Sequence, residues 1–265
     1  IQKLCKPKKD GTFNQEPELL QQLFDYCKKD VQTEMAIAAK LRPLDEAEQA
    51  IWTLTQRINT RGVPVAPHEL QNAVSAVQKA QLILDTELIE LTGCKPSERA
   101  KLLDWINNRL VTKMDDMTAD TVTKMLQRSN LAPDVRRALE LRQEGSQTSV
   151  AKYAKMLEIQ RDGKIRNTLV YHGASTGRWA SRGGLNLQNI ARPVLSDEEI
   201  ESCIGPVFEQ GIGTMSQLSS LVRSAIRAPD GYTFVDVDFS SIENRVGVYL
   251  ADQKDKVELF RKGLD

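Results

Sequence analysis

The hydrophobic positions of this chain follow helical spacing through most of its first half. Apolar side chains recur every three or four residues over 16–42, 44–58 and 67–91. Between the last two stretches, Gly62 to Val65 is predicted to be extended, because Pro64 has no amide hydrogen and disfavours helix in the residue before it. The pattern therefore predicts long helices separated by one short extended element.

Residues 97–160 predict several more helices, joined by short polar loops. Ser97 is expected to cap the first of them, and Thr118 and Pro133 are typical of further helix starts. A β-rich run follows at 165–171, and 173–189 has the glycine and amide content of irregular structure.

Toward the end of the chain, an acidic stretch at 197–201 is expected to be an insertion, and a helix is predicted around Leu218 to Ile226. Phe234, Val235 and Val237 then predict a buried strand that ends at Asp238, followed by a helix to about Leu250. The predicted fold class is α+β and predominantly helical.

Composition limits the possible classes. The chain has 265 residues and is 40% hydrophobic, which is enough for a packed core. No apolar run approaches the roughly 20 residues that cross a bilayer, and the first residues lack the apolar core of a secretory signal. The four cysteines show no metal-ligand spacing. We therefore expect a soluble, cytoplasmic protein with no membrane partner.

The net charge is zero, but the two signs are unevenly distributed. Residues 151–192 hold eight Lys and Arg against two acids, whereas 193–265 hold thirteen acids against seven bases. A basic strip followed by an acidic one suits a site that grips phosphates beside metal-binding carboxylates. Two ordinary solvated surfaces would give the same counts, and charge alone leaves both readings open.

Two segments carry candidate chemistry: TGRWASRGGLNLQNI at 176–190 and FVDVDFSSIENR at 234–245. The first is rich in arginine and amide side chains, which suit contacts to a nucleic-acid backbone and minor groove. The second places a carboxylate at the end of an apolar run, where a rigid strand would hold it as a divalent metal ligand.

Both segments resemble elements of the family A DNA polymerases of bacteria and phages. The first is similar to the family's TGR and NLQNI element, and the second resembles its motif A, usually written DYSQIELR. The resemblance assigns 1–44 to the tail of a 3'-5' exonuclease-like domain, 45–164 to a helical thumb and 165–265 to the first part of the palm, including motif A.

For the metal site, the resemblance implies that Asp238 is catalytic and coordinates Mg2+ in a two-metal site, with the carbonyl of Phe239 as a further ligand. Its alternative role is to cap the following helix. Asp236 would point to the same side of a strand as Asp238. It does not match a family position, which favours a supporting or surface role.

For the nucleotide site, the resemblance assigns Ser240 and Glu243 to dNTP binding. Glu243 corresponds to the steric gate that excludes a 2'-hydroxyl. It also lies where an acid compensates a helix dipole, and the two roles are compatible. Arg245 matches the last arginine of the motif and is expected to form a structural ion pair.

For primer–template DNA, the resemblance implies that Arg178 reaches the primer terminus from the minor groove and that Asn186, Gln188 and Asn189 contact template and primer. Lys152 is the expected thumb contact to the backbone, with Lys155 as an equal alternative. A solvated helix face would explain both lysines as well. His172 has no ligand-spaced neighbour and is not favoured as a metal ligand or general base.

Tyr26 and Asp30 lie one helical turn apart and resemble the third exonuclease motif, in which the aspartate binds metal and the tyrosine orients water. The upstream acidic motif is absent from the sequence, which predicts a remnant without nuclease activity.

No fingers segment and no second palm aspartate follow motif A in these residues. We therefore expect activity to require a second polypeptide that carries the fingers and the remaining palm. The alternatives are a non-catalytic DNA-binding module and, from another class, a helical interaction protein.

Overall fold

The computed structural model describes residues 2–264. These residues divide into two compact units, with the boundary between residues 58 and 59. The first unit contains α1 (Gln2–Cys5), α2 (Pro17–Ala38) and most of α3 (Glu46–Arg61). No described residue of α2 is buried. The predicted three-part division at 44 and 164 is not tested by this clustering and stays a prediction.

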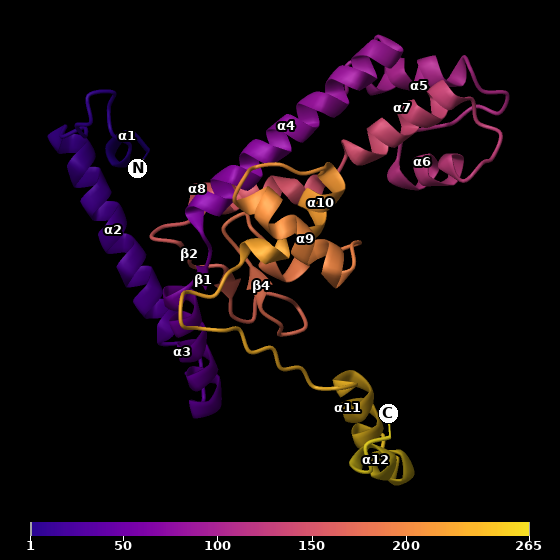
Figure 1. Cartoon of the computed structure of the whole chain (residues 1–265). Helices are drawn as coiled ribbons and strands as arrows, with labels where there is room; N and C mark the ends of the chain where they lie inside the picture. The colour runs from indigo at the N-terminus through magenta and orange to yellow at the C-terminus, as the bar shows by residue number, and fades with distance from the viewer. Residues whose placement is uncertain (1, 265) are drawn as a thin grey trace. The chain divides into compact units, whose positions relative to one another are not determined.

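The second unit is mostly helical (Figure 1). Its α-helices are α4 (Pro67–Thr92), α5 (Arg99–Asn107), α6 (Ala119–Leu126), α7 (Pro133–Glu144), α8 (Ala151–Ile159), α9 (Asp197–Phe208), α10 (Met215–Ser220), α11 (Ile242–Leu250) and α12 (Lys254–Arg261). Short 3-10 turns are η1 (Thr148–Val150), η2 (Leu187–Asn189) and η3 (Arg223–Ala225).

The strands are short and pair in two separate antiparallel ribbons. In the first, β1 (Val63–Pro64) pairs with β2 (Lys164–Ile165), and in the second, β3 (Leu169–Val170) pairs with β4 (Ala180–Ser181). Gly62 is required beside the first ribbon, because its φ is +72° and an added Cβ would lie 2.8 Å from the carbonyl oxygen of Ile165. The α+β, predominantly helical prediction is confirmed.

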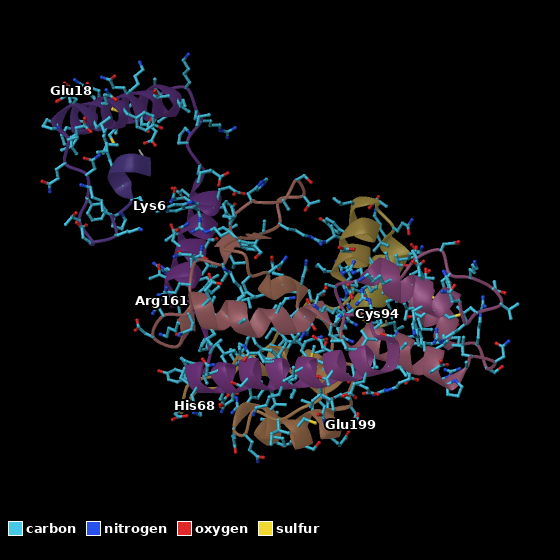
Figure 2. All side chains as sticks on the ribbon, turned by 90° about the horizontal axis from the view of Figure 1, so that it is seen from above. Lys6, Glu18, His68, Cys94, Arg161 and Glu199 are labelled. Carbon is cyan, nitrogen blue, oxygen red and sulfur yellow. The ribbon has the colours of Figure 1, made fainter. Side chains whose placement is uncertain are left out.

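Helix α4 is the central element of the second unit. Its buried residues recur every three or four positions, and it packs against α7, α8, α9 and α10. Figure 2 labels His68 near its start and Cys94 just after its end. The helix stops at Gly93, which adopts the left-handed conformation with φ +69° and donates to the carbonyl of Ile89. Burial of each large apolar side chain contributes about 1.5–3 kcal/mol.

The first half of α4 is fixed to the segment between the two sequence motifs. The Asn72 side chain donates to the carbonyls of Phe208 (2.8 Å) and Glu209 (3.1 Å), at the end of α9. Lys79 donates to the carbonyl of Gly211 at 3.3 Å. Residues 197–201, predicted as an acidic insertion, form the start of α9, and the end of this helix and the residues just after it hold α4 in place.

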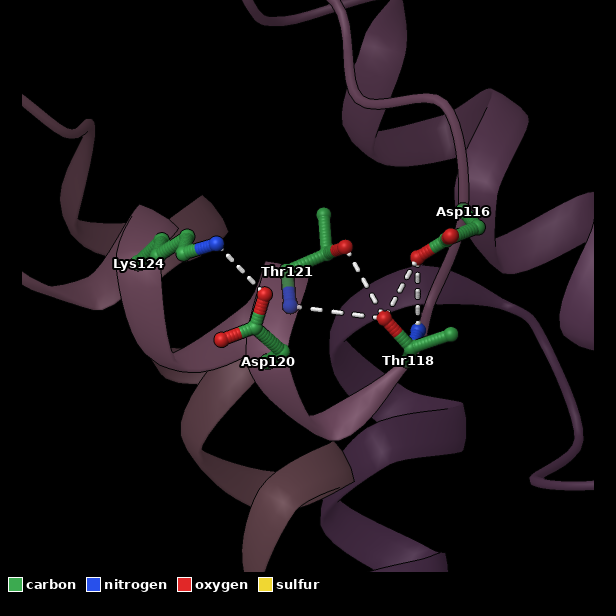
Figure 3. Close-up of polar contacts among 5 residues, drawn as sticks. All are labelled: Asp116, Thr118, Asp120, Thr121 and Lys124. Atoms are coloured by element: carbon green, nitrogen blue, oxygen red, sulfur yellow. Dashed lines mark hydrogen bonds and ion pairs between the residues drawn. The ribbon is translucent and has the colours of Figure 1, made fainter.

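At the other end of α4, α5, α6 and α7 form a small helical cluster. Thr118 caps α6 as predicted: its hydroxyl accepts from the amide of Thr121 and donates to Asp116 at 2.8 Å (Figure 3). The predicted cap at Ser97 is wrong, because α5 begins at Arg99. Glu98 precedes that helix, and its carboxylate accepts from the amide of Lys95 at 3.0 Å.

The predicted strand ending at Asp238 is wrong. Residues 231–240 form no strand and are exposed, with Val235 and Val237 at 82% and 85%. A strand needs a neighbour for its backbone hydrogen bonds, and the described strands pair only as the two ribbons above. The predicted helix after this segment is confirmed as α11. No helix in the described part of the chain is long and apolar enough to span a membrane.

Candidate nucleic-acid and metal site

An ion pair joins the two sequence motifs. The guanidinium of Arg178, in the TGR element, lies 2.6 Å from a carboxylate oxygen of Glu243, in the first turn of α11. The residues are 65 positions apart, and their side chains are 74% and 82% exposed. Solvent screening makes such a pair a weak contribution to stability. It places a cation and an acid of the candidate site side by side.

The TGR element bends sharply over a histidine. Gly177 has φ +79°, and a Cβ there would lie 3.2 Å from Nε2 of His172. Only glycine fits without displacing the ring. His172 therefore packs under the turn that presents Arg178.

The NLQN element lies between two buried apolar side chains and exposes two of its amide side chains. Leu185 and Ile190 are buried, whereas Gln188 and Asn189 are exposed. The Asn186 side chain accepts from the amide of Asn189 at 3.2 Å and thereby caps η2. The side-chain oxygen of Asn186 thus has a structural role that the sequence resemblance does not indicate.

Two further contacts hold this element in place. Gln188 donates to the carbonyl of Trp179 at 3.4 Å, which ties NLQN to the TGR turn. Arg223, the first residue of η3, donates to the carbonyl of Ile190 at 3.0 Å. No sequence motif marks Arg223, so only the structure identifies it as a support for the candidate site.

Of the two candidate lysines on α8, Lys155 lies against Gly184 of the first motif. Its Cε would be 3.2 Å from a Cβ added at Gly184, and its ammonium pairs with Glu158 at 3.0 Å. Lys152 lies one turn earlier on the same helix. The assignment of a DNA contact to either residue stays a prediction.

Asp238 is exposed, and one carboxylate oxygen accepts from the amide of Phe239 at 2.9 Å. The next helix begins after Ser241, whose φ of +48° is left-handed. Among the described residues, no group of three or more His, Cys, Asp or Glu could hold a metal ion. Mg2+ is often held by only one or two carboxylates together with substrate phosphates and water. An exposed carboxylate next to a backbone carbonyl is a donor set of this kind, and the metal roles of Asp238 and Phe239 stay predictions.

In the N-terminal unit, Tyr26 and Asp30 are neighbours on α2. The negative charge of Asp30, together with its hydrogen bond to the phenol, raises the pKa of Tyr26. The pair is therefore close enough to interact, as its spacing predicts. Its relation to exonuclease chemistry stays a prediction.

The chain belongs to DNA polymerase family A, whose family model matches residues 73–265. That range contains every candidate site residue from Lys152 onward and excludes Tyr26 and Asp30. A DNA polymerase of Bacillus phage SP02 is 33% identical over 97% of this chain and 42% of its own length.

Two further relatives match over smaller shares. A DNA polymerase of Escherichia phage T5 is 22% identical over 77% of this chain and 23% of its own length. DNA polymerase I of Chloroflexus aurantiacus is 32% identical over 40% of this chain and 9% of its own length. The chain thus spans less than half of each of these relatives. No solved structure matches it significantly.

Proposed function

We propose that this chain is part of a template-directed DNA polymerase that binds primer–template DNA and supplies Asp238 to a two-metal nucleotidyl-transfer site. Family membership supports the class of reaction. The observation that carries the site is the 2.6 Å contact between Arg178 and Glu243, which brings the two motifs to one place. The cytoplasmic location stays a prediction.

In this proposal, Arg178, Gln188 and Asn189 face the minor groove of the primer terminus. Purine N3 and pyrimidine O2 acceptors recur there in every correct base pair, so a guanidinium or amide contacts all sequences alike. Leu185 and Ile190 fix the backbone beneath these side chains.

Glu243 and Ser240 are proposed to lie beside the incoming dNTP. Binding of DNA by Arg178 would remove the partner of Glu243 and leave its carboxylate free to pack under the sugar. The exchange is energetically easy, because an ion pair this exposed is worth only about 0–1 kcal/mol.

Asp238 and the carbonyl of Phe239 are proposed to hold Mg2+. Bound metal would activate the primer hydroxyl and neutralise charge on the phosphates. A second aspartate and a cationic fingers segment are also needed. We propose that they are supplied by polymerase sequence outside these 265 residues, and the comparisons give no support for a separate second polypeptide.

The test is primer extension in Mg2+, with this chain combined with the rest of a family A palm and fingers. We expect extension by the wild type, its loss in Asp238→Ala, and near-normal activity in the matched control Asp236→Ala. Extension by Asp238→Ala at the wild-type rate would contradict the metal role. DNA binding without extension by the wild-type combination would favour the non-catalytic module.

Tyr26 and Asp30 are proposed to be an exonuclease remnant. We expect no Mg2+-dependent shortening of end-labelled single-stranded DNA by this chain. Shortening that Asp30→Ala abolishes would show a working nuclease instead.

A further inference from the structure

Asn59, in the last turn of α3, belongs to the second unit and is buried, with 3% of its surface exposed. Its side-chain amide donates to the carbonyl of Leu169 at 2.8 Å, and its side-chain oxygen accepts from the amide of the same residue at 3.0 Å. The backbone carbonyl of Asn59 also accepts from the amide of Asn167 at 3.1 Å. One buried residue therefore holds the backbone at the start of β3, across 110 positions of sequence.

The two side-chain bonds take the place of a third strand beside β3. Among the described strands, β3 pairs only with β4, and a ribbon of two short strands is marginally stable on its own. Along an antiparallel strand, successive residues turn their peptide groups toward opposite edges. Thr168 faces β4, because its carbonyl accepts from the amide of Arg182 at 3.0 Å, so Leu169 presents its N–H and C=O to the other edge. The side-chain amide of Asn59 offers that edge one donor and one acceptor, as a neighbouring strand would.

Packing alone does not explain an asparagine at this position. An apolar side chain would fill the same space, but it would leave both polar groups of Leu169 without these partners, which is costly in a buried place. The amide of Asn59 is itself expensive to bury unless its hydrogen bonds are made. The residue therefore matches the needs of the β3 backbone.

The β3–β4 ribbon carries the turn that presents Arg178. The turn leads from β3 into β4, which begins two residues after Arg178. It closes on itself, because the amide of Ala174 donates to the carbonyl of Arg178 at 3.1 Å and the amide of Gly177 donates to the carbonyl of Ala174 at 2.9 Å. The backbone position of Arg178 thus depends on the pairing of β3 with β4, and Asn59 holds β3 at its outer edge.

We propose that Asn59 is a positioning residue for the primer terminus. It fixes β3, and through the β3–β4 ribbon it sets where Arg178 meets the DNA. The proposal rests on the proposed function, because it takes the role of Arg178 from it. It adds a residue that lies before the range matched by the family model and that no sequence motif marks.

The first measurement follows the ribbon in the full chain without DNA. Asn59→Ala removes both side-chain bonds to Leu169. We expect the amide of Arg182, which bonds β4 to β3, to exchange its hydrogen about tenfold faster, because the ribbon loses two buried hydrogen bonds. Asn59→Asp keeps the acceptor for the Leu169 amide and should give a smaller increase. It takes the place of the alanine variant if that variant does not fold.

Asn107→Ala is the matched control. The Asn107 side chain makes the same pair of bonds to one backbone residue: it donates to the carbonyl of Met114 at 3.0 Å and accepts from the Met114 amide at 2.8 Å. Asn107 ends α5, in the helical cluster at the other end of α4. We expect its loss to leave hydrogen exchange at Arg182 as in the wild type, with thermal unfolding as the check on global stability.

The second measurement is single-turnover primer extension by the combined polymerase described under the proposed function. Asn59→Ala should lower the maximum rate by at least about tenfold, because a reacting end that is displaced by a fraction of an ångström reacts slowly. KM for dNTP should stay unchanged, because Arg178 is proposed to contact the primer and not the nucleotide. Asn107→Ala should leave both quantities unchanged. In an Arg178→Ala background, Asn59→Ala should cause no further loss, because its effect passes through Arg178.

A further loss in the Arg178→Ala background, or a wild-type rate in Asn59→Ala, would overturn the positioning role and leave the proposed function intact. Unchanged hydrogen exchange at Arg182 in the Asn59 variants would overturn the support of β3, whatever the extension assay gives. Absence of extension by the wild-type combination would overturn the proposed function itself, and the positioning role with it.

Discussion

Residues 67–226 and residues 228–264 both carry regularly placed apolar side chains. The first region buries most of them, and the second leaves most of them exposed. In the first region, the stripe on α4 is covered by α7, α8, α9 and α10. In the second, Val248 is the buried residue among those described, while Tyr232, Phe234 and Phe239 are exposed. An apolar pattern therefore predicts which side chains tend to be buried. Whether they are buried depends on whether another helix or strand packs against them.

The same comparison separates helices from strands. Helices α11 and α12 form although they are largely exposed, because an α-helix makes its hydrogen bonds internally. Residues 234–238 have a strand-like composition but no strand, because that structure requires a neighbouring chain segment.

The largest expected effect contrasts the two regions directly. Leu139→Ala removes a fully buried side chain from α7 and should lower the free energy of unfolding by about 2–5 kcal/mol. Val237→Ala should change it by less than about 0.5 kcal/mol. Urea unfolding measures both, and equal losses would show that the second region is packed in solution.

Tyr153→Phe should have a smaller effect. The Tyr153 hydroxyl is buried and donates to the carbonyl of Leu218 at 2.8 Å, so its loss should cost about 1 kcal/mol. Tyr249→Phe, at an exposed position of α11, is the control and should be neutral.

The same tyrosine gives a pH dependence. Burial raises the pKa of Tyr153 above its ordinary value of 10.0. The unfolded chain therefore loses this proton first, and stability should fall above about pH 10 by up to about 1.4 kcal/mol per pH unit. Unfolding of the wild type and Tyr153→Phe from pH 9 to 11 checks this. Parallel curves would contradict it.

Glu87→Gln should cost about 0.5–1 kcal/mol, because its partly exposed carboxylate receives two hydrogen bonds from Arg137, at 2.6 and 2.7 Å. Arg137 lowers the pKa of Glu87, so this stabilisation is present above pH 4.5 and is lost as pH falls through the depressed value. Acid unfolding measures the loss. Glu90→Gln, exposed on the same helix, should leave the curve unchanged.

The smallest effect is expected for Arg178 and Glu243. A double-mutant cycle to alanine should give a coupling in unfolding free energy below about 0.5 kcal/mol, because both side chains are exposed. A coupling above 1 kcal/mol would contradict the view that this pair exchanges easily for substrate.

Local signals predicted much of the fold. The spacing of Leu70, Leu84 and Leu88 predicted α4, and Thr118 predicted the start of α6. The start of α9 was also readable, since Ser196 and Glu199 form a capping box. It was missed because the acidic residues after Ser196 suggested a solvated insertion.

The candidate site was only partly predictable. The motifs identified Arg178 and Glu243, but their contact depends on how 65 residues of intervening chain fold. Arg223 carries no local signal, because it acts through the carbonyl of Ile190, which is distant in the sequence. Such roles follow from tertiary structure alone.

The length of α4 makes it a lever. Its 26 residues extend over roughly 39 Å, so a tilt of one degree at its base would move its far end by roughly 0.7 Å. The bonds from Asn72 to the end of α9 are at that base. A small rearrangement at the base would therefore move the far end of α4 by a distance large enough to make or break a hydrogen bond there.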